Sequence, residues 1–112
     1  MDVLKRLADS VVVPFVVLEK AEDAIPTANA MLAGGIDTME ITFRTACAAD
    51  AIKAVADNCP DMLVGAGTVL NLEQAKLAVS MGAKFIFSPG FSEEVVAWCV
   101  ENGIAVAPGC VT

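Results

Sequence analysis

The sequence predicts an α/β fold, in which short strands of a parallel sheet alternate with helices. Apolar, β-branched runs alternate with segments of helical periodicity along the whole chain. Glycine also stands between a helix and the next strand at 34–35, 82 and 103, where a left-handed C-cap is expected. Short turns between alternating elements favour a parallel sheet with right-handed crossovers.

The N-terminal part of the chain fits this alternation. The run from 11 to 18 is β-branched and nearly continuous, which predicts a strand. Pro26 falls in the first turn of the helix that follows, where a missing N–H is harmless. The elements expected here are a leading helix at 1–8, a strand at 11–18, a helix at 21–33 and a strand at 36–43.

The remaining part of the chain repeats the pattern. Apolar residues recur at helical spacing within 48–58. Asn71 and Ser92 are suitable N-caps, and Glu93 and Glu94 fall in a first turn where the helix dipole favours acids. The elements expected here are helices at 48–58, at 71–81 and from 92 onward, and strands at 62–69, 85–88 and 104–107.

Composition narrows the class of protein. The 112 residues are 56% hydrophobic and 19% charged, and the mean hydropathy of +0.66 is high for one small domain. These values predict strands buried on both faces, or a surface that another element covers. The net charge of −7 argues against nucleic acid or an anionic membrane as a partner. Since no apolar run approaches the ~20 residues of a membrane span, we expect a soluble, cytoplasmic protein.

Cysteine and histidine usage limits the chemistry. Cys47, Cys59, Cys99 and Cys110 form no Cys-x-x-Cys pair, and the sequence has no histidine. This spacing favours buried, reduced thiols over a zinc site, so no metal is expected. No cofactor is predicted for this sequence either. Mechanisms that need a histidine base are excluded for these residues.

Candidate chemistry gathers where the strands end. In the strand 36–43, the polar residues Thr38, Glu40 and Thr42 alternate with apolar ones and therefore share one face. A lone glutamate on an inward face is expected to have a raised pKa, which suits a general acid or base. Arg44 follows the strand and, after a bend, would bind a carboxylate or phosphate in bidentate fashion. The alternative is a structural ion pair between Glu40 and Arg44.

The segment Gly65-Ala66-Gly67-Thr68 ends the next strand. Its glycines permit close approach of a ligand or of neighbouring backbone, and the Thr68 hydroxyl can donate to a carboxylate. The segment is neither a Walker loop nor a dinucleotide fingerprint, and a tight barrel corner explains the glycines equally well. Pro89-Gly90 and Pro108-Gly109 end two further strands and are more often turns than sites.

Two architectures fit this order of elements. One is an open, doubly wound sheet of five strands, as in flavodoxin-like domains. The other is part of a (β/α)8 barrel, which needs roughly 200 residues or more. In both, functional groups lie at the C-terminal ends of the strands, where Glu40, Arg44 and Thr68 fall.

Four segments together resemble the motifs of a known enzyme family. They are EITFRT at 40–45, VGAGTV at 64–69, FSPG at 87–90 and APG at 107–109. Their order and spacing are similar to those of the bacterial 2-keto-3-deoxy-6-phosphogluconate (KDPG) / 4-hydroxy-2-oxoglutarate (KHG) aldolases. The resemblance runs over essentially the whole chain, and the set is specific where each motif alone is weak. It implies a (β/α)8 TIM barrel, of which residues 1–112 form one partial domain. That domain would hold a leading helix, strands 1–5 and helices 1–4, truncated after strand 5.

The resemblance also implies roles for individual residues. Glu40 would be the general acid and base, Arg44 and Thr68 would bind the pyruvyl carboxylate, and Pro89 would line the pocket. The family's imine-forming lysine lies on the sixth strand, so no Schiff-base lysine is expected in this chain and the fragment should be inactive alone. The resemblance leaves the choice between KDPG and KHG open and implies a homo-oligomer, typically a trimer.

Two further hypotheses stay open. A half-barrel with an uncovered apolar face and two strand edges could associate with itself as a structural module without catalysis. A complete flavodoxin-like domain could instead bind a small molecule, although the acidic cluster of a phospho-receiver is absent from the strand ends.

Overall fold

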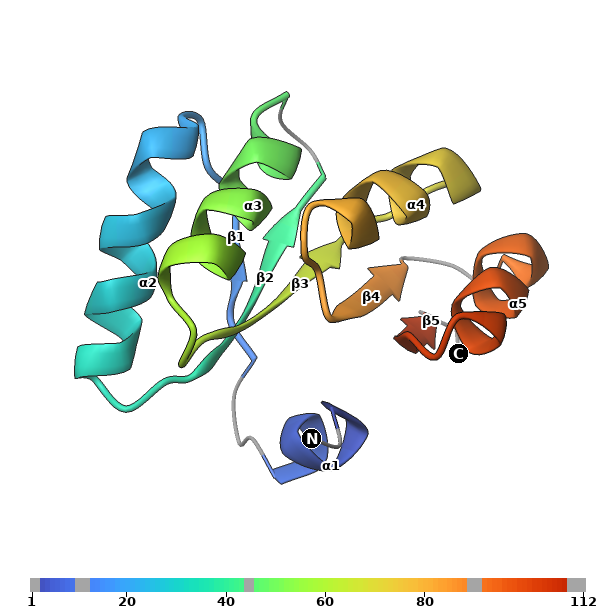
Figure 1. The fold of residues 1–112 in the computed structure, drawn as a ribbon, viewed down its shortest axis with the longest axis horizontal. Helices are drawn as coiled ribbons and strands as arrows, with labels where there is room; N and C mark the ends of the chain where they lie inside the picture. Colours follow the sequence, from blue (N-terminus) through green and yellow to red (C-terminus); the bar gives the residue numbers. More distant parts are fainter. Residues whose placement is uncertain (1–2, 10–12, 44–45, 89–91, 109–112) are drawn as a thin grey trace.

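The structure is a computed structural model and describes residues 3–9, 13–43, 46–88 and 92–108. Its five strands form one parallel sheet in the order β1-β2-β3-β4-β5 (Figure 1). The strands are β1 (Phe15–Val16), β2 (Thr38–Thr42), β3 (Leu63–Gly67), β4 (Phe85–Ser88) and β5 (Ala105–Pro108). The helices are α1 (Val3–Asp9), α2 (Ala24–Ala33) after the 3-10 turn η1 (Ala21–Asp23), α3 (Ala48–Asn58), α4 (Leu72–Ser80) and α5 (Glu93–Glu101).

The order of the strands decides between the two predicted architectures. A flavodoxin-like sheet has the order 2-1-3-4-5, because its chain reverses direction across the sheet at a switch point. Here every strand pairs with its neighbours in sequence, and every pair is parallel. This is the arrangement of consecutive strands in a (β/α)8 barrel. The flavodoxin-like alternative is therefore wrong.

The hydrophobic core lies between the sheet and helices α2 to α5. The strand residues that face the helices are each at most 1% exposed; they are Met39, Ile41, Val64, Ala66 and Ile86. The helices contribute small and β-branched side chains that are fully buried, namely Ala28, Ala51, Ile52, Val55, Ala75, Ala78 and Val95. This packing leaves the opposite face of the sheet for other contacts.

Helix α1 stands apart from the other helices, beyond the start of the strands (Figure 1). Arg6 links α1 to the residues before the strands, because its Nη2 donates to the backbone oxygens of Asp37 at 3.1 Å and Asp61 at 2.9 Å. The same nitrogen lies 3.2 Å from Oδ2 of Asp37. Since Asp37 and Asp61 precede β2 and β3, α1 covers the N-terminal end of the sheet, away from the predicted site.

Most predicted elements are confirmed to within two residues at each end. Asn71 caps α4 by accepting a hydrogen bond from the backbone N–H of Gln74 at 2.9 Å. Ser92 caps α5 in the same way, accepting from the N–H of Val95 at 3.4 Å. Local capping chemistry therefore defines where these helices begin.

The predicted strand at 11–18 is the exception in both length and burial. Within the described residues, β1 comprises only Phe15 and Val16, and residues 11–12 lie outside that part. Val16 packs against the core, but Phe15 is 62% exposed and Val17 is 43% exposed. Because β1 is the edge strand and no described element covers its second face, the expected burial on both faces is wrong here.

The predicted buried thiols are confirmed for Cys59 and Cys99, which are buried, whereas Cys47 is half-buried. None of these three described cysteines forms a disulfide. Burial raises the pKa of the Cys99 thiol above its ordinary value. Cys110 lies outside the described residues. No helix in the described ranges is long and apolar enough to cross a bilayer.

Candidate active site

The inner face of the sheet, opposite the helices, carries polar, small and aromatic residues. Residues in register on neighbouring parallel strands point to the same face, so the pairing places them in rows. The first row is Phe15-Glu40-Gly65-Phe85-Ala105, and the second row, nearer the strand ends, is Thr42-Gly67-Phe87-Ala107. The predicted parity of Glu40 and Thr42 is thus confirmed by the register.

Glu40 reaches over Gly67 of the neighbouring strand. Glu40 is half-buried, and a Cβ built on Gly67 would lie 2.8 Å from its Cδ and closer still to its Oε2. The carboxylate therefore occupies the space of the missing side chain. Gly67 is two residues nearer the strand end than Gly65, which is the register partner of Glu40. The glycine was expected to admit a ligand or backbone, whereas the structure places a neighbour's side chain there.

Phe85 occupies the equivalent space over Gly65. A Cβ on Gly65 would lie 2.5 Å from Cγ of the Phe85 ring. Phe85 is fully buried, and its ring centroid is 5.0 Å from that of Phe87. These two rings place an aromatic surface beside Glu40 on the inner face.

Thr68 follows β3 directly and holds an unusual backbone conformation. Its φ is 55°, and it is the one non-glycine residue with a positive φ among those the structure describes. A β-branched residue rarely adopts this region, and such strain typically costs about 1–3 kcal/mol and concentrates at functional sites. The positive φ supports Thr68 as a candidate site residue. The sequence motif alone was weak support for this choice.

Thr42 is a polar residue of this face to which the sequence assigned no role. It is 2% exposed, and its Oγ1 has no hydrogen-bond partner within the described ranges. Its register partner is Gly67, against which the Glu40 carboxylate lies. The alternation of residues in β2 was the available signal, because it puts Thr42 on the face of Glu40.

The structure leaves two predicted site residues undescribed. Arg44 and Pro89 lie outside the described residues, so the expected carboxylate clamp, the pocket wall and the alternative Glu40–Arg44 ion pair stay predictions. The lysines, in contrast, are all described and all exposed; they are Lys5, Lys20, Lys53, Lys76 and Lys84. None of these five lysines lies in a strand.

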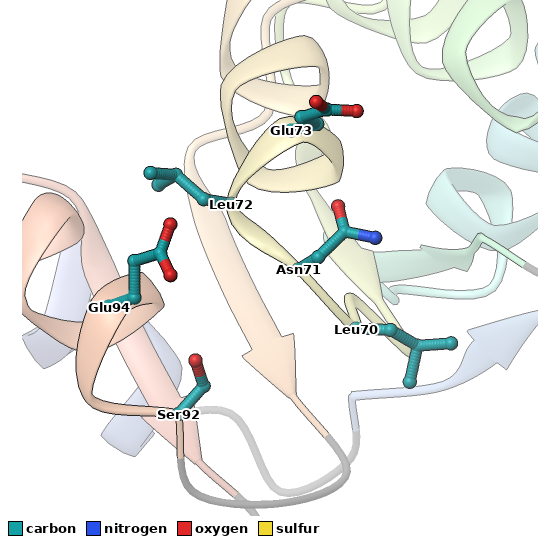
Figure 2. Close-up of a pocket in the computed structure, with 6 residues that line it drawn as sticks. All are labelled: Leu70, Asn71, Leu72, Glu73, Ser92 and Glu94. Carbon is teal, nitrogen blue, oxygen red and sulfur yellow. The ribbon is translucent and has the colours of Figure 1, made fainter.

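An open pocket of about 420 Å³ lies between the beginnings of α4 and α5 (Figure 2). Its lining residues are Leu70, Asn71, Leu72, Glu73, Ser92 and Glu94. The two glutamates make this pocket a poor site for the carboxylate of a substrate, because like charges repel. The inner face around Glu40 remains the candidate site.

Comparison with known proteins shows the family. The family model for the KDPG and KHG aldolases matches residues 3–112. The chain belongs to this aldolase family. A 2-dehydro-3-deoxy-phosphogluconate aldolase of Treponema pallidum (strain Nichols) is 53% identical over 98 residues, which are 88% of this chain and 47% of that relative. The chain spans about half the length of the curated relatives it matches.

Solved structures of this aldolase family share the fold. A 2-keto-3-deoxy-6-phosphogluconate aldolase from Zymomonas mobilis ATCC 29191 superposes with a TM-score of 0.92 at 37% identity, over 100% of this chain and 54% of that one. The KDPG aldolase from Legionella pneumophila has a TM-score of 0.88 at 39% identity, over 94% of this chain and 51% of that one. That structure holds pyruvate as a covalent carbinolamine intermediate. The sheet and helices of this chain are therefore those of the corresponding part of the family's (β/α)8 barrel.

Proposed function

We propose that this chain is the N-terminal part of a class I aldolase, one partial barrel domain over residues 1–112. The complete enzyme would cleave KDPG, KHG or both to pyruvate and an aldehyde. Family membership supports the reaction class, and the carbinolamine in the Legionella relative is the adduct that a lysine amine forms with a 2-keto carbon. The observation that carries the proposal is the Glu40 carboxylate over Gly67, at the end of β3 and one residue before Thr68.

In this proposal Glu40 moves the protons of the reaction. A lysine from the remaining part of the barrel adds to C2 of the keto acid, and Glu40 protonates the carbinolamine hydroxyl so that water leaves. Glu40 then takes the proton of the C4 hydroxyl while the C3–C4 bond breaks and its electron pair enters the imine to give an enamine. Return of that proton to C3 and hydrolysis of the imine release pyruvate.

The remaining predicted residues would hold the substrate. Arg44 and the hydroxyl of Thr68 would bind the carboxylate beside the keto group, and Pro89 would line the pocket. The positive φ of Thr68 supports its proposed role, because strained backbone of this kind concentrates at functional sites. The exposed positions of the five lysines support the expectation that the 112-residue chain forms no imine by itself.

The proposal extends to the setting of the enzyme. We infer a homo-oligomer, a trimer as is typical of the family that the sequence resembles, and a cytoplasmic location. The free thiols Cys47, Cys59 and Cys99 support a reducing compartment. The choice between KDPG and KHG depends on the part of the barrel that follows the fifth strand, where barrels commonly bind phosphate.

A joined protein tests this function. Residues 1–112 are fused to the remaining half of the Treponema pallidum relative and incubated with pyruvate and borohydride. Reduction of a pyruvyl imine should add about 72 Da to one lysine, and mass spectrometry should map that lysine outside residues 1–112. Glu40→Gln should lower aldol cleavage by at least about 100-fold. An adduct on the isolated 112-residue chain, or none on the joined protein, would contradict the proposal.

A second candidate function is supported by exposed hydrophobic side chains where the inner face of the sheet reaches its β1 edge. Phe15 and Val17 are large, exposed hydrophobic residues on the edge strand and next to it, which is unusual for a monomer that is complete. A second copy of the chain could cover this face, giving a self-associating half-barrel without catalysis.

A further inference from the structure

We propose that Gly67 is a positioning residue for Glu40. Because Gly67 has no side chain, the Glu40 carboxylate can lie over it and is thereby directed toward the C-terminal end of the sheet. The inference rests on the proposed function, in which this carboxylate transfers protons at that end.

The Phe85 ring fills the space over Gly65, which is next to Glu40 in its own row. The register partner of Glu40 on β3 is Gly65, so an upright Glu40 side chain would stand next to that glycine. The space over Gly65 belongs to Phe85, because a Cβ there would lie 2.5 Å from Cγ of the ring. Phe85 is fully buried and cannot move aside cheaply. Phe85 therefore directs the Glu40 carboxylate away from its own register partner.

Gly67 leaves room for the Glu40 carboxylate, because it has no side chain. Measured from an ideal Cβ on Gly67, Cδ of Glu40 is at 2.8 Å, Oε1 at 3.3 Å and Oε2 closer than either. Carbon atoms in contact normally keep about 3.5 Å or more. A methyl group at this position would hence displace the carboxylate by about 0.7 Å or more, taking the difference between 3.5 Å and 2.8 Å.

The backbone conformation at position 67 does not itself require a glycine. The glycines with left-handed φ among the described residues are Gly35, Gly82 and Gly103, and Gly67 is not one of them. Alanine could adopt the backbone of Gly67 without strain. The carboxylate of Glu40 is consequently the described feature that requires glycine at this position.

A double-mutant cycle on the 112-residue chain tests the contact. Gly67→Ala and Glu40→Ala are made separately and together, and urea unfolding midpoints are measured. We expect the change in midpoint caused by Gly67→Ala to be less favourable beside Glu40, whose carboxylate must shift, than beside Ala at 40, where the methyl group takes the space that the carboxylate left. Gly34→Ala is the matched control, since a Cβ there meets backbone oxygens only at 3.6 and 3.7 Å. Equal effects of Gly67→Ala in both backgrounds would overturn the inference.

The fused full-length protein tests the consequence for catalysis. Gly67→Ala should lower kcat by about 100-fold, since a misplacement of about 1 Å can cost that much, and should leave KM nearly unchanged. The limb of the pH–rate profile that reports Glu40 should also move, which a purely structural change would not cause. Gly34→Ala should keep the parent values. Unchanged kcat and pH profile in Gly67→Ala would overturn the positioning role. An inactive parent fusion would instead overturn the proposed function, and the urea cycle would still decide the contact.

Discussion

At the residue scale, Thr38 and Thr42 show two different uses of a buried hydroxyl. Both lie on the inner face of β2, and they are 1% and 2% exposed. Thr38 has an interaction partner, whereas Oγ1 of Thr42 has no hydrogen bond among the described residues. A buried hydroxyl without a partner costs about 1–3 kcal/mol of stability. The unpaired Thr42 hydroxyl thus lowers the stability of the chain, and it lies close to the proposed catalytic carboxylate.

This contrast predicts opposite effects of the same substitution. Thr42→Val removes the hydroxyl and keeps the branched shape, so the free energy of unfolding of the 112-residue chain should rise by about 1 kcal/mol. Thr38→Val should lower it by about 1 kcal/mol, because it removes an interaction that is made. Urea unfolding monitored by circular dichroism checks both variants. A loss of stability in Thr42→Val equal to that in Thr38→Val would show that the Thr42 hydroxyl is satisfied.

At the element scale, the Arg6 side chain links α1 to the N-terminal end of the sheet. Arg6 donates to the backbone oxygens of Asp37 and Asp61, and its ion pair with Asp37 involves a carboxylate that is 56% exposed. The exposed ion pair contributes little by itself, since solvent screens it. Among these Arg6 contacts, the hydrogen bonds to the two backbone oxygens therefore contribute more than the ion pair.

Replacing this side chain should release the helix. Arg6→Ala is expected to lower the free energy of unfolding by about 1–2 kcal/mol and to speed amide hydrogen exchange in α1. Lys53→Ala is the matched control, because the Lys53–Asp57 pair is 60% and 56% exposed and should contribute less than about 0.5 kcal/mol. Hydrogen exchange in α1 that is the same in Arg6→Ala and the parent would show that other contacts hold the helix.

At the scale of the whole molecule, the sheet has one covered face and one that the described residues leave partly open. Helices α2 to α5 cover the face of Met39 and Ile41, while Phe15 on the edge strand stays 62% exposed. In the complete barrel that the relatives form, further strands would continue the sheet from its edges. Without them, the open face and the two edges favour association.

Self-association of the isolated chain follows from this exposure. Light scattering should show dimers or larger species, and the chain should bind a hydrophobic dye. Phe15→Ser should weaken association by roughly tenfold or more, because burial of a phenylalanine contributes about 1.5–3 kcal/mol. Val100→Ser is the control: Val100 is 68% exposed but lies on α5, away from the inner face. A monomer that binds no dye would exclude the self-associating half-barrel.

Much of the fold could be predicted because it depends on neighbours in sequence. Helix ends follow from the caps Asn71 and Ser92, and strand parity places Glu40 and Thr42 on one face. Strand β1 was predicted too long, because a continuous apolar run does not reveal whether both of its faces find partners. The candidate site was predicted in part: Glu40 lies in the middle of β2 with its carboxylate over the last residue of β3, which Thr68 follows, while Arg44 and Pro89 stay predictions.

By itself, then, the sequence determined the alternation of strands and helices, the capped helix ends and the motifs by which the family is recognised. The tertiary structure decided the strand order, the exposure of the edge strand and the place of the Glu40 carboxylate over Gly67. The physical reason is the range of the interactions. Caps and periodicity act within a few residues, whereas strand order and the space left by Phe85 depend on segments far apart in the chain.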